Sequence, residues 1–220
     1  MKIKNLIGLL LILGFVLAIQ PAESWTSGPQ NKFTPANNQA LTTEGGNVTE
    51  LNISQDISTE KWAGLWGNLS GNILLSDGTS NFYIWTWSPS NGGVVCAQPS
   101  STANFDWSAA AATTAGEVDA AFSFTTTDTD SATNTLTETC SLTISGTSIT
   151  GAPAVTASGF QTCSLEDTST LPTKSDLAFC TSITTGTTLF NGGTGDYALM
   201  IPTTESAGST ETYVFWLELQ

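Results

Sequence analysis

The 220-residue sequence predicts an all-β fold, an antiparallel β-sandwich of jelly-roll type with about 10–11 short strands. Two observations support this prediction. Short segments of alternating apolar and polar residues follow one another along the chain, as expected for half-buried strands. Turn-forming residues such as Asp77-Gly78 and Asn191-Gly192-Gly193 separate these segments, and none of them has a convincing helical period.

The clearest hairpin signal lies in residues 61–87. Asp77-Gly78 favours a two-residue turn, which would pair Ser76 with Thr79 and bring Asn68 next to Trp87. In that register, one face of the hairpin is apolar and is expected to face the core: Ala63, Leu65, Leu69, Ile73, Leu75, Phe82 and Ile84. The other face carries the aromatic residues that are the best candidates for a ligand-binding or interface surface: Trp62, Trp66, Tyr83, Trp85 and Trp87.

Further strands are expected throughout the rest of the chain, at residues 48–54, 93–97, 118–126, 135–144, 149–155, 160–165, 177–183, 187–190, 196–201 and 212–219. Gly151 and Pro153 interrupt one of these strands, which is therefore expected at a sheet edge. Residues 105–117 are predicted to form a loop or a single helical turn, and residues 128–134 a turn.

Three regions follow one another along the chain. Residues 1–22 are predicted to be a signal peptide, because Lys2 and Lys4 precede an apolar run of about 14 residues and Ala22 is a plausible cleavage position. An uncleaved membrane anchor is the alternative. Residues 23–46 form an extended arm, either a flexible leader or a strand donated to a neighbouring subunit. Residues 47–220 are predicted to form a single β-sandwich domain.

The charge balance excludes several classes of partner. The chain has 19 acidic residues, five lysines and no arginine or histidine, for a net charge of −14. Loss of the predicted signal peptide leaves three lysines against 19 acidic residues, so the net charge becomes −16. Nucleic acid and anionic membrane surfaces are bound mainly by cationic side chains, so neither is an expected partner. No membrane span is predicted after signal cleavage.

Four cysteines, an even number in a predicted secreted chain, suggest two disulfides with three possible connectivities. Cys163 and Cys180 flank a polar loop and are the expected pair, which leaves Cys96 with Cys140. A zinc site formed by the four thiolates is the alternative, but the spacing lacks a CxxC motif. Three N-glycosylation sequons begin at Asn47, Asn52 and Asn68.

No catalytic motif is present, and the sequence predicts a protein that is not an enzyme and has no cofactor. The absence of histidine excludes imidazole-dependent triads. Two-carboxylate glycosidase chemistry requires an acid pair, and no motif connects the acidic candidates Asp77, Asp106, Asp119, Glu138 and Asp196. The run Asp128-Thr129-Asp130, followed by Asn134 and Glu138, loosely resembles a calcium loop but lacks its glycine and its spacing, which favours a simple polar turn.

The segments TEGGNVTELNIS, EKWAGLWGNLSGNILL, YIWTW, GGVVCA and ETYVFWLEL together resemble a group of uncharacterised secreted archaeal surface proteins. This resemblance implies an extracellular or cell-surface β domain and carries no site residues.

Two functional hypotheses follow from the sequence. The first is a secreted, non-enzymatic cell-surface or filament-forming structural protein, stabilised by disulfides and glycosylated, with other copies of itself or other surface proteins as partners. The second is a carbohydrate-binding or adhesive module that binds glycans on the aromatic face of the hairpin.

Overall fold

The computed structural model describes residues 19–35, 40–168, 171–204 and 210–220. The fold is all-β and antiparallel, as predicted, while the jelly-roll connectivity stays a prediction. The main sheet has eight strands in the described residues. Seven of them follow the order β1 (Gln20–Pro21), β14 (Val214–Leu219), β5 (Gly93–Gln98), β10 (Leu177–Ser182), β9 (Phe160–Glu166), β8 (Thr147–Ala157) and β7 (Glu138–Ile144). The short strand β6 (Ala111–Ala112) pairs with β9.

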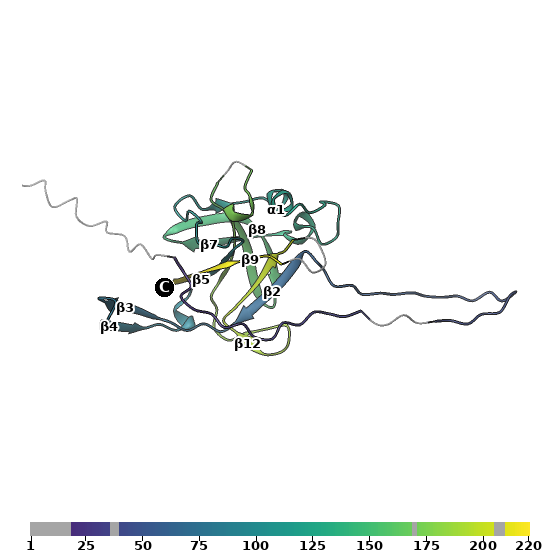
Figure 1. Cartoon of the computed structure of the whole chain (residues 1–220), viewed down its shortest axis with the longest axis horizontal. Helices are drawn as coiled ribbons and strands as arrows, with labels where there is room; N and C mark the ends of the chain where they lie inside the picture. Colours follow the sequence, from purple (N-terminus) through teal and green to yellow (C-terminus); the bar gives the residue numbers. More distant parts are fainter. Residues whose placement is uncertain (1–18, 36–39, 169–170, 205–209) are drawn as a thin grey trace, which may run out of the picture.

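Three two-stranded sheets accompany the main sheet. They are β2 (Trp62–Gly67) with β13 (Tyr197–Pro202), β3 (Asn72–Ser76) with β4 (Asn81–Thr86), and β11 (Thr187–Thr188) with β12 (Thr194–Gly195). Helical segments in the described residues are α1 (Ala115–Phe122), α2 (Ala132–Thr135) and the 3-10 turns η1 (Pro89–Asn91) and η2 (Lys174–Asp176). Figure 1 shows α1 and β2 beside the main sheet, whereas β3 and β4 project away from it.

The central strands β5 and β10 are buried on both faces, and an apolar cluster lies on each side. Along β5, Val94 and Cys96 belong to the first cluster, whereas Val95 and Ala97 belong to the second. The first core also contains residues of β7 and β8, such as Leu142. The second contains residues of β2, β13 and α1. Because side chains alternate along a strand, the two faces of β5 contribute to two different cores.

Residues 118–126 were predicted as a strand, which is wrong, because residues 115–122 form helix α1. Thr114 caps this helix: its hydroxyl accepts a hydrogen bond from the Glu117 amide at 3.2 Å, and the Glu117 carboxylate accepts one from the Thr114 amide at 2.8 Å. Val118 and Phe122 are four residues apart and both buried, a spacing that fits one face of a helix as well as one face of a strand.

The prediction that residues 149–155 form an edge strand is also wrong, because β8 lies between β7 and β9. Cys140 pairs with Ala152 and Ser141 with Thr150, which makes Gly151 the extra residue of a bulge. Its φ of +73° is the left-handed conformation that glycine adopts readily. The glycine that suggested an edge therefore accommodates a bulge within the sheet, and the edge strand is β7.

The N-terminal end of the described chain is part of the domain. Ile19 is buried in the first core, Gln20 and Pro21 pair with Leu217 and Trp216, and the Ala22 amide donates to the Phe215 carbonyl at 2.8 Å. The sequence placed these residues in the signal peptide, the rest of which lies outside the described residues. Among the described residues, no helix has the length and apolar character needed to span a membrane.

Candidate functional site

The β3–β4 hairpin, residues 72–86, projects away from the domain (Figure 1). Its two strands pair only with each other, and every residue of both strands is exposed. An isolated two-stranded hairpin is only marginally stable in water, because it buries little of its own apolar surface. The hairpin therefore differs from the longer strands of the main sheet, each of which contains buried residues.

Both faces of the hairpin are apolar. Ile73 pairs with Trp85 and Leu75 with Tyr83, so these four side chains share one face. Leu74 and Ile84 pair on the other face. The exposed fraction of its large apolar side chains runs from 42% for Ile73 to 85% for Phe82. Monomeric proteins rarely expose apolar patches of this kind, which usually mark an interaction surface.

The register of the hairpin differs from the predicted one because its loop is longer. The Asp77 carboxylate accepts hydrogen bonds from the Thr79 amide at 2.8 Å and the Ser80 amide at 2.7 Å. These bonds lower the pKa of Asp77, and the bond from Ser80 has the larger effect. Ser76 consequently pairs with Asn81 rather than with Thr79, although Gly78 has the left-handed φ expected for the turn. The predicted core face is wrong for the hairpin strands, whose apolar residues are all exposed.

The base of the hairpin is fixed to the domain at both ends. Trp87 is buried in the second core, and its indole nitrogen donates to the Gly92 carbonyl at 3.3 Å. On the other side, the Leu69 amide donates to the Asp196 carboxylate at 2.9 Å. A buried tryptophan and a side-chain hydrogen bond thus hold the base, while no segment of the described chain covers the strands beyond it.

The five aromatic residues predicted to share one surface are divided among three places. Trp62 and Trp87 are buried in the second core, where Trp62 lies 6.3 Å from the ring of Phe124. Trp66 packs against Phe190 with ring centroids 6.2 Å apart. Tyr83 and Trp85 remain together on the hairpin, with centroids 4.8 Å apart. Of the five predicted residues, only Tyr83 and Trp85 remain next to each other on an exposed surface.

A second projection, the arm loop, comprises residues 23–60. Figure 1 shows it leaving the domain on the side opposite the hairpin, reaching a distant tip and returning. The tip is a turn in which the Asn47 amide donates to the Glu44 carbonyl at 3.2 Å, with Gly46 at a φ of +91°. The described part of the arm loop exposes several large apolar side chains: Trp25, Phe33, Leu41, Val48, Leu51, Ile53 and Ile57.

The returning leg of the arm loop has the sequence pattern of a strand but no sheet. Leu51 and Ile53 alternate with polar residues, and this alternation is why residues 48–54 were predicted as a strand. That prediction is wrong for the structure, which has no strand between residues 47 and 59. Ile53 is 83% exposed, so the apolar row has no cover.

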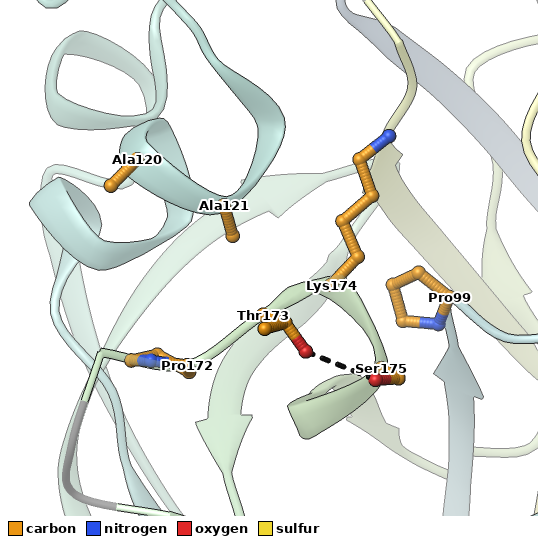
Figure 2. A pocket seen from close by; sticks show the side chains of 7 residues that line it. All are labelled: Pro99, Ala120, Ala121, Pro172, Thr173, Lys174 and Ser175. Carbon is orange, nitrogen blue, oxygen red and sulfur yellow. Dashed lines mark hydrogen bonds between the residues drawn. The ribbon is translucent and has the colours of Figure 1, made fainter.

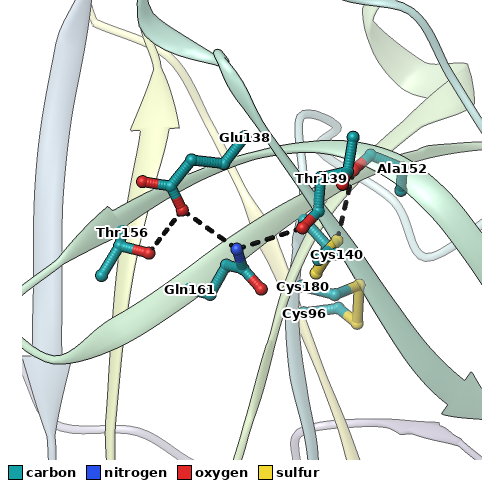
Figure 3. The surroundings of a disulfide bond; sticks show 9 residues. Cys96, Glu138, Thr139, Cys140, Ala152, Thr156, Gln161 and Cys180 are labelled. Carbon is teal, nitrogen blue, oxygen red and sulfur yellow. Dashed lines mark hydrogen bonds between the residues drawn. A yellow bond between two sulfur atoms is a disulfide. The ribbon is translucent and has the colours of Figure 1, made fainter.

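Two disulfides join strands around the first core, Cys96–Cys180 and Cys140–Cys163, and no cysteine remains free (Figure 3). The predicted connectivity is therefore wrong, and the zinc alternative is excluded because all four sulfurs are in disulfides. The sheet order explains the error, since Cys180 lies opposite both Cys96 on β5 and Cys163 on β9. Disulfides of this kind are typical of proteins in oxidising, extracellular compartments.

The three sequon asparagines Asn47, Asn52 and Asn68 are all exposed. Exposure is what an attached glycan requires, and glycosylation itself stays a prediction. Asn47 and Asn52 lie on the arm loop, and Asn68 precedes the hairpin. Asn68 is exposed and Trp87 is buried, so the two predicted neighbours do not share a solvent-exposed surface.

The carboxylates considered for glycosidase chemistry each take part in local hydrogen bonds. Asp119 is buried and accepts bonds from the amides of Ala132 and Thr133 at the start of α2. Glu138, shown in Figure 3, accepts from Thr156 and Gln161 at 2.7 and 3.0 Å. The others behave similarly: Asp77 in the hairpin loop, Asp106 with Ser108, and Asp196 with Leu69.

Glu166 is the most unusual carboxylate. Its side chain is nearly buried, and its Oε2 atom has no hydrogen-bond partner. Burial has the largest effect on the pKa of Glu166 and raises it, and the negative charge of Glu117 raises it further. It lies on β9 and does not line the surface depression described below.

The residues that resemble a calcium loop bind a lysine instead. The Lys61 ammonium lies 3.1 Å from an Asp128 oxygen and 2.7 Å from an Asp130 oxygen. Burial raises the pKa of Asp130, but hydrogen bonds from Lys61 and Thr59 and the charge of Lys61 outweigh it, and the net effect lowers that pKa. In the described residues, no group of three potential metal ligands is found.

A surface depression of about 500 Å³ lies between α1 and η2 (Figure 2). Seven residues line it: Pro99, Ala120, Ala121, Pro172, Thr173, Lys174 and Ser175. Lys174 is the one titratable residue among them, and its ammonium forms an ion pair with Glu211 and lies 4.8 Å from the Phe122 ring centroid. These contacts tie η2 to its neighbours, and the ion pair offsets the one charge in the lining of the depression.

No protein-family model, curated protein or solved structure matches this chain. The two apolar projections are therefore the features of the described structure that bear most directly on function. The sequence assigned Ile73, Leu75, Phe82 and Ile84 to the core. A signal against that assignment was available: Gly, Ser and Pro residues are concentrated at 67–71 and 88–93, on both sides of a hairpin that is apolar on both faces.

Proposed function

We propose that this protein is a secreted structural protein that associates with copies of itself into head-to-tail polymers at the cell surface. The observation that carries the proposal is the pair of apolar projections, the β3–β4 hairpin and the arm loop, which leave the domain in opposite directions (Figure 1). Each copy therefore has two chemically different ends.

Different ends favour open polymers. When one end of a subunit binds the other end of the next, the contact is heterologous, and it produces a filament unless the rotation between subunits closes a ring. The exposed apolar side chains supply the driving force, because association removes them from water. The two disulfides suit a protein that works in an oxidising compartment outside the cell.

The charge distribution supports contact at the hairpin. With a net charge of −14, copies of this chain repel one another over most of their surface. Residues 72–86 contain a single charged residue, Asp77, which lies in the loop. The hairpin is thus a surface on which like-charged copies can meet with little electrostatic cost.

A second candidate function is carbohydrate binding at the hairpin, and the specific observation behind it is the exposed Tyr83–Trp85 ring pair. Aromatic rings stack on the apolar faces of sugar rings, with a hydroxyl or indole N–H available for hydrogen bonds. A pair of rings makes a small platform, so we rank this function below self-association.

The test is the assembly state of the secreted protein. Size-exclusion chromatography with light scattering and negative-stain electron microscopy should show oligomers or filaments that grow with protein concentration. A monomer at every concentration would contradict the proposal. If that monomer also changes its tryptophan fluorescence with a polysaccharide, and Trp85→Ala abolishes the change, carbohydrate binding is the better assignment.

A further inference from the structure

We infer that residues 47–58 of one copy add as a third strand to the β3–β4 hairpin of the next copy. This inference rests on the proposed self-association and identifies the two segments that make the contact. The first segment has the sequence pattern of a strand but no sheet to join, and the second is a sheet of only two strands. In the described residues, no other strand of the same chain pairs with either of them.

The donor is the returning leg of the arm loop. In an extended strand, residues 51–57 would place Leu51, Ile53, Gln55 and Ile57 on one side and Asn52, Ser54 and Asp56 on the other, so one side is mainly apolar and the other polar. The apolar residues are 60–83% exposed, and no strand pairs with this segment. An amphipathic strand without a sheet can hydrogen-bond its backbone and cover its apolar row by joining the edge of another sheet.

The acceptor is the hairpin. Because β3 and β4 pair only with each other, each has an outer edge whose backbone groups have no strand partner. A third strand would satisfy one of these edges and bring the sheet to the size at which β-structure becomes independently stable. On one face, Ile73, Leu75, Tyr83 and Trp85 provide the apolar surface that the Leu51 and Ile53 side chains would extend.

The geometry favours pairing between copies rather than within one. The arm loop and the hairpin point away from each other, so the donor strand of a copy is far from its own acceptor (Figure 1). A neighbour placed end to end brings the two together. Asn52 lies on the side opposite the Leu51 and Ile53 row, so a glycan on this sequon would not cover the apolar contact.

Two variants separate donor from acceptor. Leu51→Ser with Ile53→Ser disables the donor strand and leaves the hairpin intact, whereas Tyr83→Ala with Trp85→Ala disables the acceptor face and leaves the arm loop intact. All four residues are exposed and outside the apolar cores, so the substitutions should leave the fold unchanged. Circular dichroism and unfolding midpoints provide the check.

Each variant alone should behave as a monomer, while an equimolar mixture should form a dimer with twice the monomer mass and grow no further. The intact arm loop of the acceptor-defective copy binds the intact hairpin of the donor-defective copy, and both remaining ends are disabled. Matched controls are Phe33→Ala, an exposed aromatic on the other leg of the arm loop, and Phe190→Ala, an exposed aromatic outside the hairpin. Both control variants should assemble like the unmodified protein.

The outcomes distinguish the inference from the proposed function. If the unmodified protein is monomeric, self-association itself fails. If it assembles but either double variant still polymerises, or the mixture of variants stays monomeric, then copies associate through other surfaces and the strand-addition contact is wrong.

Discussion

Cys96 on β5 and Cys180 on β10 lie directly opposite each other, with Cα atoms 4.1 Å apart, and their disulfide joins positions separated by 84 residues. The second disulfide, Cys140–Cys163, spans only 23 residues. In the chain-entropy description, a disulfide stabilises the fold by restricting the unfolded chain, and the effect grows with the length of the closed loop. The two bridges should therefore contribute unequally.

We expect Cys96→Ala with Cys180→Ala to lower the free energy of unfolding by about 4.5 kcal/mol, and Cys140→Ala with Cys163→Ala by about 3.4 kcal/mol. Urea unfolding of both double variants measures this difference, and the smaller loss serves as the internal reference. Equal losses, or a larger loss for the shorter loop, would contradict the entropic account. Peptide mapping under non-reducing conditions tests the connectivity itself, and a Cys163–Cys180 peptide would contradict it.

Asp119 should contribute to stability through its hydrogen bonds to the start of α2. Its carboxylate accepts hydrogen bonds from the Ala132 amide at 2.6 Å and the Thr133 amide at 3.0 Å, which are donors at the start of α2. Asp119→Ala leaves these donors without their acceptor in a buried region, so the free energy of unfolding should fall by about 2–3 kcal/mol. Urea unfolding checks this value.

The matched control for Asp119 is Asp106→Ala. The Asp106 side chain is exposed and accepts its hydrogen bonds from Ser108 in the same loop, so its removal should change stability by no more than about 0.5 kcal/mol. A similar loss for both variants would mean that burial of the Asp119 contacts is not what makes them stabilising.

The loop of the hairpin should loosen in acid. Hydrogen bonds from the Ser80 and Thr79 amides lower the pKa of Asp77 below its ordinary value of 3.8. A group with a lowered folded-state pKa stabilises the folded loop above its unfolded pKa, and that stabilisation is lost as the pH falls through the folded value. Amide exchange at Thr79 and Ser80, followed by NMR, should therefore stay slow near neutral pH and, after correction for intrinsic rates, lose protection below about pH 3.8.

Asp77→Ser provides the comparison for this pH dependence. The hydroxyl side chain can still accept a hydrogen bond but does not titrate in this range, so the protection of both amides should be independent of pH between about 6 and 2. Persistence of the pH dependence in Asp77→Ser would show that another group controls the loop.

Ile19 should make the N-terminal boundary of the chain important for stability. A chain that begins at Glu23 lacks the Ile19 side chain in the first core and the pairing of Gln20 and Pro21 with β14. Burial of one isoleucine stabilises by about 1.5–3 kcal/mol, so this chain should unfold at a lower urea concentration than one beginning at Ile19. Ile19→Ala in the longer chain separates the side chain from the strand pairing. Equal midpoints for the two chain lengths would contradict the assignment.

Much of the fold follows from local sequence. The strands around Cys96, Cys163 and Cys180 were predicted within a few residues, because apolar runs bounded by turn residues leave little choice of conformation. The left-handed turn at Gly78 was predicted for the same local reason. Helix α1 was missed although Thr114 and Glu117 have capping-box spacing, since Val118 and Phe122 fit both a helical and an alternating pattern.

The sequence by itself determined the fold class, the turns, the acidic charge and the even number of cysteines. Only the tertiary structure decided which cysteines pair, because Cys180 has two neighbours in the sheet, Cys96 and Cys163. It also decided that the hairpin and the arm loop lie outside the cores. Alternation along a strand sets the side to which each residue points, whereas burial depends on whether another segment covers that side. For Ile53 and Trp85, none does in the described chain.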